Sequence, residues 1–100
     1  MDINEAKDLM DRSEITLVDI RDAASFTEAH IKNALNINDS NIEEFLKNTK
    51  KDKPLLCYCY HGHSSQNAAQ YFLDEGFKTV HSMNGGFEAW RQIHPFVSGS

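Results

Sequence analysis

The chain has 100 residues, of which 40% are hydrophobic, and it carries a formal net charge of −5 with a pI near 5.4. A chain of this length forms one domain with a modest core, which needs neither a metal nor disulfides. The acidic balance argues against general binding of nucleic acid or of anionic membranes, because both need clustered positive charge. No apolar stretch approaches the roughly 18 residues of a membrane span, and residues 1–5 do not have the pattern of a signal peptide. We therefore expect a cytoplasmic protein.

Helices and strands alternate in the first half of the chain. Asp2 or Asn4 can cap a first helix, and Asp39 with Ser40 can cap a later one. Between them lies a compact β-branched and apolar run that is flanked by charge, which is typical of a buried strand. The predicted elements are a helix over 4–10, a strand over 16–20, a short helix over 23–28, a brief strand over 35–37 and a helix over 41–48.

The second half repeats this alternation. Pro54 opens a central strand that runs to Cys59, at a position where the missing N–H does least harm. Gly76 fits the position just past a helix end, and Pro95 is expected to end the last helix. The predicted elements are a helix over 65–75, a strand over 79–83, a turn at 84–86 and a helix over 87–93.

Alternating strands and helices predict an α/β sandwich with a mainly parallel sheet that is flanked by helices on both faces. We expect residues 1–96 to form this single domain and residues 97–100 to form a frayed tail, of the kind that cloning can leave. Ligands of such sheets bind at the carboxyl ends of the strands, and Cys59 lies at one of these ends.

The stretch 55–65 carries the chemistry of the sequence. An apolar run stops at Cys59, crosses a short loop that contains Gly62, and enters a helical pattern. Amides of such a loop and of a helix start form a cradle for anions, and they stabilise the thiolate, which is the nucleophilic form of cysteine. A pKa lowered from about 8.5 to roughly 6.5 raises the thiolate fraction at pH 7 from about 3% to about three-quarters. Because a helix terminus supplies only ~0.3–1 of the ~2.7 kcal/mol that this shift needs, the loop amides must donate directly to the sulfur.

Other side chains near Cys59 have simpler interpretations. His61 and His63 can add positive charge to the loop, but solvated histidines fit an exposed loop equally well. Cys57 lies inside the strand and is expected to pack there as a reduced thiol, because residues 57 and 59 of one strand hold their Cβ atoms beyond the ~4 Å that a disulfide needs. A zinc site made of these four side chains is disfavoured, since four ligands within seven residues would strain the backbone. We therefore expect no metal.

Residues 59–65 resemble the active-site loop of the rhodanese sulfurtransferases, most closely that of the single-domain thiosulfate sulfurtransferases of the GlpE type. The resemblance extends over nearly the whole chain and implies a rhodanese-like three-layer sandwich. Family members usually have a short edge strand before the first helix, for which this sequence offers only residues 1–3. The blocks that agree in order and approximate spacing are Leu17-Val18-Asp19-Ile20-Arg21-Asp22, Ala29-His30-Ile31 with Ala34-Leu35-Asn36-Ile37, Cys59-Tyr60-His61-Gly62-His63-Ser64-Ser65 and Asn84-Gly85-Gly86-Phe87-Glu88-Ala89-Trp90.

The resemblance implies a two-step sulfur transfer without an organic cofactor or a metal. The thiolate of Cys59 would take the outer sulfur of thiosulfate and release sulfite, which leaves a persulfide on Cys59. Cyanide, a dithiol or a thioredoxin-like protein would then accept the sulfur. The residues expected to bind the substrate around Cys59 are Tyr60, His61, Gly62, His63, Ser64 and Ser65.

Two alternative functions remain open. Cysteine phosphatases and arsenate reductases need an arginine six residues after the nucleophile, and this position is Ser65 here. Many rhodaneses have a basic residue at the fifth position, which is Ser64 here as in GlpE-type loops, so affinity for thiosulfate is expected to be weak. A non-catalytic, partner-binding rhodanese module is the other alternative, although such modules often lack the cysteine.

Asp19 and Arg21, at another strand end, form either a structural ion pair or part of the site mouth.

Overall fold

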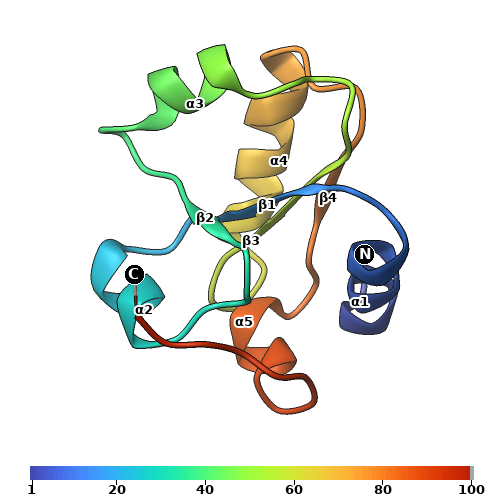
Figure 1. Cartoon of the computed structure of the whole chain (residues 1–100), viewed down its shortest axis with the longest axis vertical. Helices are drawn as coiled ribbons and strands as arrows, with labels where there is room; N and C mark the ends of the chain where they lie inside the picture. The colour runs from blue at the N-terminus through green and yellow to red at the C-terminus, as the bar shows by residue number, and fades with distance from the viewer. Residues whose placement is uncertain (100) are drawn as a thin grey trace.

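The computed structural model describes residues 1–99 and contains one four-stranded parallel sheet with the strand order β2-β1-β3-β4. In Figure 1 the sheet lies between helices, which alternate with the strands along the chain. The strands are β1 (Thr16–Asp19), β2 (Leu35–Asn36), β3 (Leu55–Tyr58) and β4 (Val80–Ser82), and the helices are α1 (Ile3–Arg12), α2 (Ala23–Glu28), α3 (Ile42–Asn48), α4 (Ser64–Asp74) and α5 (Gly86–Trp90).

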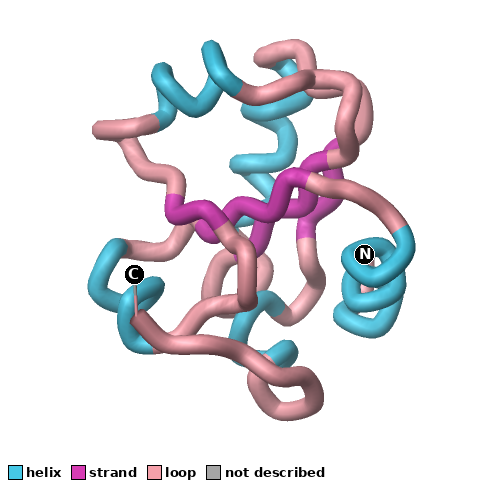
Figure 2. Tube along the Cα trace, in the orientation of Figure 1, coloured by secondary structure: helices cyan, strands magenta, loops and turns pink. Residues whose placement is uncertain are grey.

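The sheet is the middle one of three layers, which confirms the predicted sandwich. Helices α3 and α4 cover one face, and α1, α2 and α5 cover the other, so that in Figure 2 the strands form a band between two groups of helices. Every residue of β1 and of β3 is buried. Strands that are covered on both faces need apolar side chains at successive positions, which explains the unbroken apolar runs in the sequence.

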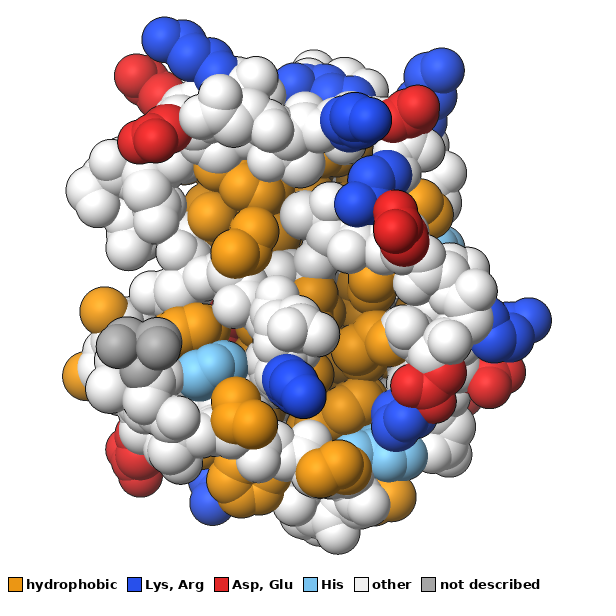
Figure 3. Space-filling view, in the orientation of Figure 1, with side chains coloured by type: hydrophobic (Ala, Val, Ile, Leu, Met, Phe, Trp, Pro, Cys, Tyr) orange, Lys and Arg blue, Asp and Glu red, His pale blue; other side chains and the backbone are white. Residues whose placement is uncertain are grey.

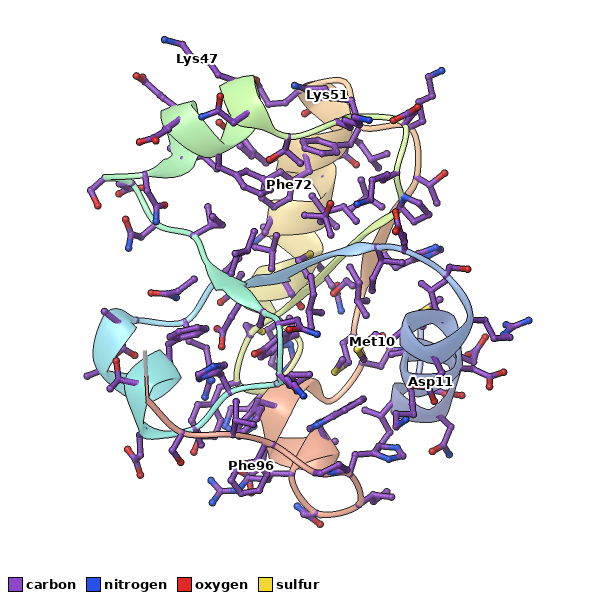
Figure 4. The ribbon with its side chains drawn as sticks, in the orientation of Figure 1. Met10, Asp11, Lys47, Lys51, Phe72 and Phe96 are labelled. Atoms are coloured by element: carbon purple, nitrogen blue, oxygen red, sulfur yellow. The ribbon has the colours of Figure 1, made fainter. Side chains whose placement is uncertain are left out.

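Side chains of the central strand alternate between two cores. Leu55 and Cys57 point toward α3 and α4, where they join a cluster that contains Phe72, and Figure 4 shows Phe72 extending from α4 toward α3. Leu56 and Tyr58 point the other way, into a cluster with α1 and α5. The cysteine that follows Tyr58 is therefore expected on the α4 side, since side chains alternate along a strand.

The N-terminal segment differs in part from the expectation. Of the two predicted caps of α1, Asp2 and Asn4, the structure uses Asp2. It accepts a hydrogen bond from the N–H of Glu5, and the Glu5 side chain accepts one from the N–H of Asp2. The edge strand is reduced to Met1, whose backbone lies beside the end of β4. The amino group of Met1 donates to the carbonyl of Ser82 at 3.0 Å, and the N–H of Asn84 donates to the carbonyl of Met1 at 2.7 Å. A full strand cannot form because the helix already begins at Ile3.

The predicted cap of α3 is wrong. Asn41 occupies the cap position, without a side-chain hydrogen bond to the helix, in place of Asp39 or Ser40. A network centred on Asn38 explains the difference. Its N–H donates to the side chain of Asn41, and its own side chain accepts from the N–H and the hydroxyl of Ser40. Ser40 is therefore engaged before the helix begins.

The C-terminal part also differs in detail. Helix α5 ends at Trp90, five residues before Pro95, and the indole of Trp90 donates to the carbonyl of Pro95 as the chain turns back. Val97 exchanges two backbone hydrogen bonds of 2.8 Å with His30, and the N–H of Gly99 donates to the carbonyl of Thr27, so these residues are held against the domain. The division into a domain of residues 1–96 and a tail stays a prediction, and residue 100 lies outside the described residues.

Candidate active site

Cys59 directly follows β3, at the carboxyl end of the sheet, and is only 6% exposed. Its sulfur accepts hydrogen bonds from the N–H of Gly62 at 3.0 Å and from the N–H of Ser65 at 3.4 Å. Gly62 belongs to the loop, and Ser65 belongs to the first turn of α4. Both kinds of donor that the sequence indicates, a loop amide and a helix-start amide, thus point at one sulfur atom.

The loop keeps this shape because a second turn holds its carbonyl groups. The N–H of Phe87 donates to the carbonyl of Cys59 at 2.9 Å, and the N–H of Glu88 donates to the carbonyl of Tyr60 at 3.0 Å. This approach requires glycine at position 86, where a Cβ would lie 2.5 Å from the carbonyl oxygen of Cys59 and where φ is +59°. With its carbonyls tied to α5, the loop leaves its amides free to face the sulfur.

Ser65 has contacts with both cysteines and with β4. Its hydroxyl oxygen lies 3.6 Å from the sulfur of Cys59 and 2.7 Å from the hydroxyl oxygen of Ser82, and its side chain is fully buried. The thiol of Cys57 donates to the carbonyl of Ser65 at 3.4 Å. Sequence reasoning missed Ser82, and only the pairing of Ser82 beside Cys57 in the parallel sheet could have indicated it.

The environments of the two cysteines move their pKa values in opposite directions. Burial alone would raise the pKa of Cys59, but hydrogen bonds from the Ser65 hydroxyl and from the amides of Ser65, Gly62 and His61 hold it below its ordinary value of 9.0. Burial, followed by the nearby charge of Cys59, raises the pKa of Cys57 to about 12. Both thiols are free, and Cys57 packs in the core as predicted.

The other residues of the loop face the solvent. Tyr60, His61, His63 and Ser64 are exposed, and the rings of Tyr60 and His61 lie 5.1 Å apart. His63 occupies the cap position of α4 but makes no side-chain cap hydrogen bond. The first-turn amides of α4 are therefore not used by a capping side chain.

Asp19 and Arg21 form an ion pair inside the domain. The Nε and Nη2 atoms of Arg21 donate to the Asp19 carboxylate at distances of 2.7–3.1 Å, and Nη2 also donates to the carbonyl of Ala29 at 2.6 Å. Burial alone would lower the pKa of Arg21, but the hydrogen bonds to Asp19 and its negative charge raise this pKa. The guanidinium lies 4.3 Å from the ring centroid of Phe87 and 5.8 Å from that of Tyr60. This ion pair fits the structural interpretation, because the Asp19 carboxylate already neutralises the charge of Arg21.

Lys47, Lys51 and a large hollow beside α1 lie away from the loop of Cys59. Lys47 and Lys51 are at the opposite end of the molecule from α5, as Figure 4 shows. Apolar side chains line a hollow beside α1 in Figure 3, where a cavity of about 430 Å³ is bounded by Met10, Leu17, Ile31 and Trp90 among others. None of the residues 59–65 lines this cavity, so its size does not bear on the chemistry of the cysteine.

Comparison with known proteins agrees with this geometry. Residues 2–93 match the model of the rhodanese-like domain. The chain belongs to the rhodanese family. Among curated rhodanese relatives, a protein of Vibrio cholerae named thiosulfate sulfurtransferase GlpE is 46% identical over 100 residues, which cover all of this chain and 94% of that protein. A protein of Coxiella burnetii with the same name is 45% identical over 91 residues, which cover 91% of this chain and 85% of that protein.

Solved structures show the same rhodanese fold. The BH2092 protein from Bacillus halodurans is 30% identical and superposes with a TM-score of 0.85, with 98% of this chain and 75% of that chain covered. Within the part of this rhodanese domain that the structure describes, no helix is long and apolar enough to cross a membrane.

Proposed function

We propose that this rhodanese domain is a thiosulfate sulfurtransferase that carries the transferred sulfur on Cys59. The observation that supports the proposal is the sulfur of Cys59, which two backbone amides and the hydroxyl of Ser65 surround at the end of the central strand. The curated relatives at 45–46% identity, which are named thiosulfate sulfurtransferase GlpE, add support from outside the structure.

In the first step, the thiolate of Cys59 attacks the outer sulfur of thiosulfate. A new S–S bond forms to Cys59 while the S–S bond of thiosulfate breaks, and the electron pair of that bond leaves with sulfite. The persulfide that remains carries one negative charge on its outer sulfur. Amides of residues 60–65 hold this charge in the way that an oxyanion hole holds an oxyanion.

In the second step, a thiophilic acceptor attacks the outer sulfur. Cyanide would leave as thiocyanate, and a thiolate would take the sulfur as its own persulfide, which restores the thiolate of Cys59 in both cases. A dithiol, alone or on a thioredoxin-like protein, can then release the sulfur as hydrogen sulfide when its second thiol closes a disulfide. The steps use only thiolate, amide and hydroxyl groups, so no organic cofactor or metal takes part.

The lowered pKa of Cys59 supports this route, since only the thiolate attacks sulfur. A cytoplasmic location would suit the two free thiols and a dithiol acceptor. A phosphatase would need an arginine where Ser65 stands, and Ser65 is fully buried against Cys59 and Ser82. A binding module without catalysis would have no need for a stabilised thiolate.

Mass spectrometry of the intact protein tests the proposal. Incubation with thiosulfate should add one sulfur atom, about 32 Da by the mass of sulfur, and cyanide or a dithiol should remove it. The Cys59→Ser variant should gain nothing, whereas Cys57→Ala should still be loaded, because its thiol is buried and does not ionise near neutral pH. Uptake of sulfur by Cys59→Ser would reject the assignment. A wild-type protein that takes up no sulfur would favour the non-catalytic module.

A further inference from the structure

We infer that Ser82 is a positioning residue for Cys59, which it influences by orienting the hydroxyl of Ser65. The inference rests on the proposed function, for which the thiolate of Cys59 is the reactive group. Ser82 lies at the end of β4, and its Oγ is 2.7 Å from the Oγ of Ser65. The Oγ of Ser65 lies in turn 3.6 Å from the sulfur of Cys59.

The number of available protons determines which of the two serine hydroxyls donates the hydrogen bond between them. Ser65 has one hydroxyl proton, and its side chain is fully buried, so water cannot substitute for its neighbours. When Cys59 is a thiolate, the proton of Ser65 must point to the sulfur, and the Oγ of Ser65 is then free to accept from Ser82. When Cys59 is a thiol, its S–H donates to Ser65 and the proton of Ser65 turns to Ser82. The direction of the two-hydroxyl chain therefore follows the charge on the sulfur.

Ser82 favours the thiolate state for an electrostatic reason. A hydroxyl that accepts a hydrogen bond becomes a stronger donor, because hydrogen bonds in a chain polarise one another. The donation from Ser82 thus strengthens the bond from Ser65 to the charged sulfur. Removal of Ser82 deletes the bond between the two hydroxyls in both charge states of Cys59, but only in the thiolate state does it also weaken a hydrogen bond to a charged atom, which is the stronger kind.

The backbone holds Ser82 in place for this task. Ser82 pairs with Cys57 in the parallel sheet, and the following residue, Met83, donates its N–H to the carbonyl of Cys57 at 3.0 Å. The thiol of Cys57 donates to the carbonyl of Ser65. Cys57 and Ser82, which are neighbours across two strands, therefore contact Ser65 at its carbonyl and at its hydroxyl and fix the first turn of α4 against the sheet.

The test is a double-mutant cycle that reads the pKa of Cys59 from the rate of alkylation against pH. At pH values below the pKa of Cys59, we expect Ser82→Ala to reduce the thiolate fraction of Cys59 by about two- to threefold. Ser65→Ala should reduce this fraction more, because Ser65 contacts the sulfur directly. In the Ser65→Ala background, Ser82→Ala should change nothing further. Thr79→Ala is the matched control. It removes an exposed hydroxyl just before the start of β4, at the opposite end of the strand from Ser82, and should leave the pKa of Cys59 unchanged.

A second pair of variants guards against a folding defect. Thr and Val have the same shape and both suit a strand, so Ser82→Thr should keep the pKa of wild type while Ser82→Val should shift it as Ser82→Ala does. Two results would overturn the inference: an unchanged pKa in Ser82→Val, or a Ser82→Ala shift of equal size with and without Ser65. Alkylation needs no sulfur donor, so the cycle can succeed even if thiosulfate fails to load the wild-type protein, and the two failures are distinguishable.

Discussion

Charge stabilisation at Cys59 comes from uncharged groups. Its sulfur has two amides and one hydroxyl as neighbours, and no lysine or arginine lies between Cys59 and Ser65 in the sequence. The two histidines of the loop, His61 and His63, are exposed to solvent, which screens any charge that they carry. The hydroxyl of Ser65 and the backbone amides are the groups that lower the pKa of Cys59, so we expect them, and not histidinium, to be the main source of thiolate stabilisation.

Replacement of His61 and His63 together by Gln tests this account. The pKa of Cys59 should rise by well under one unit, which corresponds to less than about 1.4 kcal/mol, and sulfur transfer should stay largely intact. Thiolate absorbance or the alkylation rate against pH measures the shift, and His94→Gln serves as a control away from the loop. A rise of two units, with activity that falls as pH passes through the histidine range, would instead assign the stabilisation to histidinium.

Among the elements, the first turn of α5 decides the shape of the loop that it contacts. Gly86 lies so close to the carbonyls of Cys59 and Tyr60 that a Cβ would be 2.5–2.6 Å from their oxygens. Gly76 also has a positive φ, of +104°, but a Cβ there would meet only the flexible side chain of Lys51, at 3.3 Å. A comparison of substitutions at Gly76 and at Gly86 therefore distinguishes the cost of backbone strain from the effect of displacing the loop.

We expect Gly86→Ala to lower the free energy of unfolding by more than Gly76→Ala, which should cost about 1 kcal/mol from its strained φ alone. Gly86→Ala should also raise the pKa of Cys59, because the loop must move away from α5 and its amides then lose their aim at the sulfur. Urea unfolding and alkylation against pH measure the two effects. Equal losses of stability in the two variants, with an unchanged thiol pKa, would show that α5 does not shape the loop.

Local patterns predicted most of these elements but not their contacts. The apolar runs identified both central strands, and Asp2 and Gly76 marked the ends of their helices correctly. The cap of α3 was missed because the side chain of Asn38 engages Ser40 before the helix begins. The end of α5 was set by the chain turning back at Pro95. The pattern of strand, loop and helix and the family resemblance both indicated Cys59, while the close contact of Gly86 depends on how segments far apart in the chain meet.

For the molecule as a whole, the buried thiol of Cys57 links folding to alkaline pH. In the folded protein the pKa of Cys57 is raised from 9.0 to about 12, so the unfolded chain loses this proton first as the pH increases. The contribution of Cys57 to stability is therefore unchanged well below pH 9 and falls between pH 9 and 12. Cys59 has the opposite sign: its lowered pKa gives stability that is present above pH 9 and is lost as the pH falls through the folded-state pKa.

Urea unfolding of wild type and of Cys57→Ala under reducing conditions, at pH 8 and at pH 10.5, tests this linkage. At pH 8 the variant should be less stable, because it leaves a small cavity in the core. At pH 10.5 the difference should have moved by about 2 kcal/mol in favour of the variant, which follows from 1.5 units of pH at about 1.36 kcal/mol each. Cys59→Ser should move in the other direction. A difference between wild type and Cys57→Ala that is the same at both pH values would contradict the raised pKa.

The hydrogen bonds from Phe87 and Glu88 to the loop also bear on the stage of folding at which the reactive thiolate of Cys59 forms. Residues 59 and 87 are far apart along the chain, so we expect a partly folded chain in which α5 has not docked to hold an ordinary, weakly ionised thiol. We therefore expect the stabilised thiolate to form only when α5 has docked on the loop. The rate at which the thiol is alkylated at neutral pH should then report whether this contact between distant parts of the chain has formed.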